Sequence, residues 1–159
     1  MTEAEALRAL HSEDERVIAR AEAALWEMWC RSGRSDVDAA FRTGIAQMER
    51  REFREAAGAF SRVIELMPEF TEGWNKRATV RYLLQDYEGA VADCRETLAR
   101  KPAHFGALSG QGLCHLALGQ PVAAAACFRR VIEVHPRLAS ARENLATAVG
   151  RLAQGNGHT

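Results

Sequence analysis

The chain has 159 residues, of which 47% are hydrophobic and 26% are charged. This composition is typical of one globular domain with a proper core. The formal net charge is zero, which argues against strong non-specific attraction to nucleic acid or anionic lipid. The charge is uneven along the chain, since residues 1–70 carry 14 acids and 10 bases (net −4) and residues 71–159 carry 7 acids and 11 bases (net +4).

The first segment, residues 1–36, is predicted to form an N-terminal helical extension. Its start is acidic and contains no apolar run of signal-peptide length, so we expect a cytoplasmic location. Ser12 followed by Glu15 predicts a capping box at the start of a helix. Apolar residues then recur at helical spacing; they are Val17, Ala21, Ala24, Leu25, Trp26, Met28 and Trp29. We expect this helix to pack on the segment that follows it.

A 34-residue period runs through residues 37–138 and divides them into blocks 37–70, 71–104 and 105–138. Prolines mark the period at Pro68, Pro102 and Pro136 (102 − 68 = 34 and 136 − 102 = 34). The eighth and twentieth positions of each block are small; they are Gly44, Ala78, Gly112, Ala56, Ala90 and Ala124. The twenty-fourth and twenty-eighth positions carry Phe60, Cys94, Phe128, Ile64, Leu98 and Ile132. Since helices approach closely only where side chains are small, each block predicts a closely crossed helix pair that ends at proline.

The stretch 102–128 contains no Asp, Glu, Lys or Arg. Gly119-Gln120-Pro121 interrupts it with a helix stop followed by a helix start. The stretch therefore divides into helices near 105–118 and 121–134. Neither contains the roughly 20 apolar residues that a bilayer span requires, so the sequence predicts no membrane contact.

The last segment, residues 139–159, is predicted to be a capping helix with a disordered tail. Its narrow apolar stripe consists of Ala141, Leu145, Ala148 and Leu152. A terminal helix with one polar face is what a stacked array of repeats needs at its end. The final GNGHT, residues 155–159, has no side chains able to pack.

The three blocks resemble tetratricopeptide repeats (TPRs). The middle block has Trp74, Ala78, Tyr87, Ala90, Leu98 and Pro102 at family positions. The resemblance implies an all-α fold, an α-solenoid of three TPR helix pairs with an N-terminal helical cap and a C-terminal capping helix. The whole chain resembles short bacterial TPR proteins with an extra N-terminal helix.

The blocks depart from the family pattern at two positions. The seventh position is usually leucine, and in the three blocks it is Thr43, Arg77 and Gln111. The eleventh position is usually aromatic, and it is Gln47, Arg81 and His115. Trp74 does stand at a family core position. We expect altered local packing around them.

The resemblance also implies that the first helix of each pair lines a concave groove that binds a peptide or helix of another protein. Carried over position by position, the groove residues are Phe41, Arg42, Ile45, Asn75, Lys76, Thr79, Tyr82, Ser109 and Leu113. Arg42 and Lys76 are equivalent in adjacent repeats, so they can meet one acidic group, unless they pair with Asp38 or Glu72 instead. Gly106 and Gly110 replace the cations of the carboxylate clamp by which some TPRs hold chaperone tails.

No pattern predicts catalysis, a metal or a cofactor. Cys30, Cys94, Cys114 and Cys127 lack CxxC spacing and predict buried, reduced thiols. Cys114 and His115 are adjacent and point about 100° apart on a helix, so they form no nucleophile–base pair. His104 and His135 stand at turns, where capping or solvation accounts for them.

We therefore expect a non-catalytic scaffold or adaptor whose partner is another protein, with neither nucleic acid nor membrane bound. The alternative is a self-associating structural subunit of a larger assembly. The apolar third block and the opposite charges of the two halves would drive such a homo-oligomer.

Overall fold

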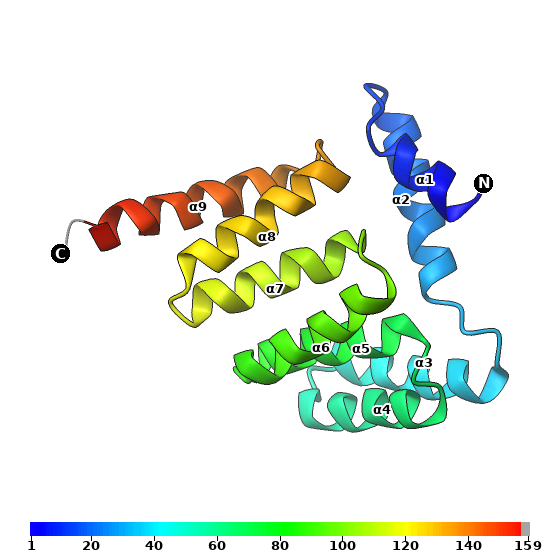
Figure 1. Ribbon diagram of the computed structural model, residues 1–159. Helices are drawn as coiled ribbons and strands as arrows, with labels where there is room; N and C mark the ends of the chain where they lie inside the picture. Colours follow the sequence, from blue (N-terminus) through cyan, green and yellow to red (C-terminus); the bar gives the residue numbers. More distant parts are fainter. Residues whose placement is uncertain (157–159) are drawn as a thin grey trace.

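The computed structural model describes residues 1–156, which form nine α-helices with no strand among them (Figure 1). The helices are α1 (Glu3–Ala9), α2 (Glu15–Trp29), α3 (Ser35–Glu49), α4 (Phe53–Leu66), α5 (Thr71–Leu83), α6 (Tyr87–Arg100), α7 (Phe105–Ala117), α8 (Pro121–Val134) and α9 (Ala139–Asn156). Consecutive pairs α3–α4, α5–α6 and α7–α8 stack in order, and α9 packs on α8. The predicted all-α solenoid is confirmed. Within the described range, no helix has both the length and the apolarity needed to cross a membrane.

The helices of each pair cross at the small residues that the period predicted. Ala90 and Ala124 are fully buried. A Cβ placed on Gly112 would lie 2.5 Å from the Phe128 ring, and the first repeat has the same arrangement. The middle repeat has Ala78 and Cys94 at the equivalent positions. Ala78 therefore has a methyl group that the glycines of the other two repeats lack, and it faces the smaller side chain of Cys94 in place of phenylalanine.

Gly112→Ala is expected to lower the free energy of unfolding by about 1–3 kcal/mol, because the new methyl group overpacks the crossing. In a Phe128→Cys background the same change is expected to stabilise the protein by up to about 1 kcal/mol, since alanine favours helix and the ring is gone. Urea denaturation of the four proteins measures both effects. Equal costs in the two backgrounds would show that the ring contact does not require the glycine.

The turn inside each pair contains one residue in the left-handed conformation. Arg51, Gln85 and Gly119 have φ values of 61°, 64° and 70°. In the third turn the Gln120 N–H donates to the His115 carbonyl at 2.8 Å, which closes the end of α7. Because α8 begins at Pro121, the uncharged stretch divides as predicted.

Trp74 is only half-buried, although it stands at a family core position. Its Nε1 donates to the Pro68 carbonyl at 2.8 Å. The guanidinium groups of Arg77 and Arg100 lie over its ring at 5.3 and 4.9 Å from the centroid. The indole therefore covers a turn near the surface, flanked by cations.

The N-terminal segment forms two helices, and the predicted capping box at Ser12 and Glu15 is wrong. The capping box belongs to α1, where the side chains of Thr2 and Glu5 bond to each other's backbone N–H groups. Asp14 caps α2, because its carboxylate stands directly before the first helical residue and accepts an N–H from the first turn. Ser12 instead accepts the N–H of Asp14.

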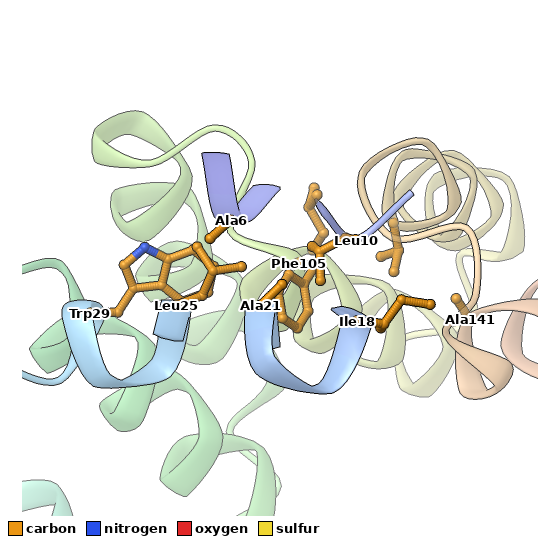
Figure 2. Packing of buried hydrophobic residues seen from close by; sticks show 10 residues of the cluster. Ala6, Leu10, Ile18, Ala21, Leu25, Trp29, Phe105 and Ala141 are labelled. Atoms are coloured by element: carbon orange, nitrogen blue, oxygen red, sulfur yellow. The ribbon is translucent and has the colours of Figure 1, made fainter. Parts of the chain in front are cut away.

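The prediction that the N-terminal helix packs on the segment that follows it is also wrong, because the α1–α2 hairpin does not pack mainly on the first repeat. Figures 1 and 2 show it beside the start of α7 and the turn between α8 and α9. The cluster joins Ala6, Leu10, Ile18, Ala21, Leu25 and Trp29 to Phe105, Leu108, Val131 and Ala141. Cys30, just after α2, packs against the hydrophobic cluster of the first repeat. Apolar burial drives this docking, and most of the apolar side chains that the hairpin covers belong to α7, α8 and α9.

Helix α9 closes the other end of the stack. Ala141 and Ala148 are fully buried, and Leu145 packs beside Ala148 against α7 and α8. The helix includes Gly155 and Asn156, so the first two residues of the predicted disordered tail are helical. The remainder of that tail, residues 157–159, lies outside the described residues.

Candidate binding groove

Two hollows open along the first helices of the pairs. The first hollow has a volume of about 630 Å³ and lies between α2 and α3. It is lined by Glu27, Cys30, Arg31, Asp38, Phe41, Arg42, Ile45, Ala46 and Glu49. It brings together three predicted groove residues, Phe41, Arg42 and Ile45. Because α2 supplies its other side, this hollow also contains charged residues that the family pattern does not include.

The second hollow has a volume of about 340 Å³ and lies between α5 and α7. It is lined by Asn75, Ala78, Thr79, Tyr82, Leu83, Cys94, Gly106, Ser109, Gly110, Leu113 and Cys114. It brings together five predicted groove residues, Asn75, Thr79, Tyr82, Ser109 and Leu113. Tyr82 lies edge-on to Tyr87, with 5.6 Å between ring centroids. No lining residue is charged.

Lys76 lines neither hollow, because α2 covers it. Its Nζ lies 5.6 Å from the centroid of the Trp26 ring. A Cβ placed on Gly106 would approach the same indole to 2.9 Å. The N-terminal hairpin therefore occupies the end of the predicted groove where α5 and α7 begin.

A buried polar network lies beneath this hairpin. Glu72 and His104 are fully buried, and His104 Nε2 donates to Glu72 Oε2 at 2.9 Å. His104 Nδ1 accepts the Ala107 N–H at 3.0 Å, which assigns the proton of the neutral ring to Nε2. Asn75 Nδ2 donates to Glu72 Oε1 at 2.6 Å. The Trp29 ring stacks on His104 at 4.3 Å between centroids and shields the network from water.

This network uses groups that the sequence assigned to other roles. The Glu72 carboxylate is bonded to His104 and Asn75, and not to Lys76. Asp38, the other alternative partner, accepts from the Ser32 hydroxyl at 2.6 Å, and this hydrogen bond lowers the pKa of the Asp38 carboxyl. Capping does account for His104, since its ring accepts an N–H of the first turn of α7.

In the second and third pairs, polar contacts stand at the positions that depart from the family pattern, whereas Gln47 Oε1 of the first pair is buried without a hydrogen-bond partner among the described residues. Asp93 is 2% exposed and accepts two hydrogen bonds from Arg77, both at 2.9 Å. Arg81 Nη1 donates to the same carboxylate at 2.9 Å. In the third repeat, Cys127 Sγ lies 3.5 Å from Gln111 Oε1 at the equivalent positions. These ion pairs and polar contacts replace the usual leucine and aromatic contacts between the two helices.

The four cysteines are free thiols, as the sequence predicted, but only Cys94 and Cys114 are buried, whereas Cys30 and Cys127 are partly exposed. Burial raises the pKa of each thiol. The pKa of Cys114 rises to about 11, and the pKa of Cys94 rises further. Cys94 and Cys114 are buried and line the second hollow, where protonated thiols act as small apolar groups. Among residues 1–156, no group of three His, Cys, Asp or Glu side chains is arranged to hold a metal ion.

Sequence reasoning missed two sets of lining residues. Glu27 on α2, and Cys30 and Arg31 just after it, line the first hollow, but the sequence analysis assigned no residue of this segment to the groove. Ala78 and Cys94 were identified as crossing residues, yet both also line the second hollow. The ion pairs of Arg77 and Arg81 with Asp93 could have been predicted from the sequence, because these residues stand at the seventh, eleventh and twenty-third positions of one repeat.

Related proteins are longer than this chain. It is 26% identical over 125 residues to a TPR repeat-containing protein of Rhizobium etli, covering 79% of this chain and 61% of the relative. It is 32% identical over 111 residues to the Hsp70-Hsp90 organizing protein of Triticum aestivum, covering 70% of this chain and 19% of the relative. The chain therefore spans less than two thirds of the length of either relative.

Several solved structures share the fold. The first TPR of Spaghetti (RPAP3) bound to the HSP90 peptide SRMEEVD has a TM-score of 0.73 at 21% identity, covering 74% of this chain and 93% of that one. The TPR2B domain of yeast Sti1 in complex with pHsp70 gives 0.69 at 19%, covering 77% and 99%. MamA gives 0.71 at 14%, covering 84% and 71%. At these identities the likeness establishes the fold alone.

The family assignment is based on sequence and structure together. The tetratricopeptide repeat model matches residues 41–105 and 75–133, which together make up more than half of the chain. These matches fall on the stacked pairs α3 to α8. The chain belongs to the tetratricopeptide repeat family.

Proposed function

We propose that this protein is a non-catalytic adaptor that holds a peptide or helix of a partner protein on the face formed by α3, α5 and α7. One observation carries the proposal: predicted groove residues from α5 and from α7 line the same hollow. Rigid stacked helices hold these side chains in place before binding, which lowers the ordering cost on the protein's side.

The relatives support a protein as the partner. One structural neighbour is bound to an HSP90 peptide and another is in complex with pHsp70. The proposal involves no cofactor, metal, nucleic acid or membrane. Free, protonated thiols suit a reducing compartment, so we propose a cytoplasmic location.

Site-specific photo-cross-linking tests this proposal. Thr79 is exposed and lines the second hollow, whereas Asn75 is 6% exposed and holds Glu72, which makes Thr79 the safer position. Benzoylphenylalanine at Thr79 is expected to capture a partner protein in a lysate of the producing organism. The control places it at Ala92, which is exposed on α6 and lines neither hollow.

The cross-linked products separate the alternatives. A partner captured from Thr79 and not from Ala92 supports an adaptor that binds through this face. Identical products from both positions contradict the assignment of the face. A second copy of this chain as the sole product would replace the adaptor with the self-associating subunit.

A further inference from the structure

We propose that the second hollow takes an uncharged, apolar side chain from an extended partner segment, and that it excludes acidic tails such as SRMEEVD. The inference rests on the proposed function and specifies the chemistry of its partner. It departs from the structural neighbour that binds this HSP90 peptide.

The lining of the hollow is neutral throughout. Its polar members are Asn75, Thr79, Tyr82 and Ser109, and its remaining members are apolar side chains, glycines and protonated thiols. A carboxylate that entered would lose its hydration without gaining a countercharge. Such burial is strongly unfavourable, so the hollow discriminates against acidic side chains by the absence of a cation.

The three cations of α5 are already engaged, and α7 has no Lys or Arg. Lys76 lies against the Trp26 ring under α2. Arg77 and Arg81 are bonded to the buried carboxylate of Asp93. Recruiting any of these groups to a partner's carboxylate would break a contact that stabilises the fold. The hollow therefore stays neutral because contacts elsewhere in the fold hold these cations.

The size and rim of the hollow suit one side chain with its flanking backbone. A volume of about 340 Å³ lies at the small end of the range for binding pockets, roughly 300–1,000 Å³. The hydroxyl groups of Tyr82 and Ser109 make no hydrogen bond within the described part of the chain. They are free to pair with N–H and C=O groups of an extended segment, while Ala78 and Leu113 contact its apolar side chain.

Gly110 provides a direct way to fill the hollow. A Cβ placed there would meet only Cys94 Sγ, at 3.7 Å, which is an ordinary contact. Gly110→Leu therefore puts four carbons into the hollow without entering the helix crossing. Gly58→Leu is the matched control, because Gly58 is helical and exposed and has open space around it.

The experiment selects random twelve-residue peptides by display on the wild-type protein. The binding of the recovered peptide and of SRMEEVD is then measured by fluorescence anisotropy. We expect recovered peptides to carry leucine, methionine or phenylalanine without acidic clusters, and SRMEEVD not to bind. Gly110→Leu is expected to weaken binding of the recovered peptide at least tenfold, and Gly58→Leu to leave it unchanged. If Gly110→Leu does not fold by circular dichroism, Gly110→Ala replaces it, with at least a twofold loss expected.

The outcomes separate the two proposals. Recovery of acidic peptides, or binding of SRMEEVD to the wild type, overturns the neutral-segment inference and leaves the adaptor in place. Equal binding of an apolar peptide to wild type and both leucine variants also overturns the inference, since the peptide then lies elsewhere. Failure to recover any peptide, together with no partner cross-linked from Thr79, overturns both.

Discussion

Replacing Trp29 with alanine is expected to lower the free energy of unfolding by about 3–5 kcal/mol. The side chain is 2% exposed, and its ring stacks on His104 and lies edge-on to Trp26 at 5.4 Å. Its loss opens a cavity above the buried Glu72–His104 pair and loosens α2 from α7. Urea denaturation followed by far-ultraviolet circular dichroism measures the effect.

Trp74→Ala is the matched control for Trp29→Ala. Trp74 is half-buried near the surface, where it covers the Pro68 turn and contacts two arginines. We expect its loss to cost less than about 2 kcal/mol, because no internal cavity forms. Equal costs for the two variants would contradict the docking of α2 over the buried pair.

The second large effect is expected from Asp93→Ala. This change leaves Arg77 and Arg81 without their shared carboxylate, and breaking such a buried pair typically costs about 3–5 kcal/mol. The side chains of Arg77 and Arg81 are 15% and 29% exposed, so both can reach toward water. We therefore expect a loss near 3 kcal/mol, at the lower end of that range.

A compensated variant tests the physical reason. Asp93→Ala combined with Arg77→Leu and Arg81→Tyr restores the leucine and aromatic residues usual at the seventh and eleventh family positions. Apolar replacement of a whole buried ion group is often neutral or stabilising, so most of the lost stability should return. Urea midpoints of the single and triple variants provide the measurement. A triple variant as unstable as Asp93→Ala would show that the crossing cannot accept the usual apolar residues.

The repeat architecture was predictable because it depends on local and periodic signals. Small residues such as Ala90 set the close crossing and recur with the 34-residue period. The Gly119-Gln120-Pro121 turn is a local signal, because glycine ends one helix and proline starts the next. The second hollow follows from the same regularity, since Thr79 and Leu113 are equivalent positions of adjacent repeats.

The position of the N-terminal hairpin was not predictable on the same basis. The buried stripe of Ile18, Ala21, Leu25 and Trp29 shows that α2 needs an apolar partner surface, but the period carries no information about which surface. The contacts at this interface join residues far apart in sequence, such as Trp29 with Phe105, Lys101 with Glu3 and His135 with Glu22. Lys76 was assigned to the groove for the same reason, because only the docked hairpin covers it.

The docking of α1–α2 on α7–α9 has a consequence for synthesis on the ribosome. Trp29 is translated more than a hundred residues before Ala141, which belongs to the same cluster. At about 5–20 residues per second, the nascent hairpin stays without its surface for on the order of ten seconds. Two tryptophans remain open to other chains meanwhile, so general chaperones that bind exposed apolar segments should engage this protein co-translationally through residues 15–29. They should release it once α9 has emerged.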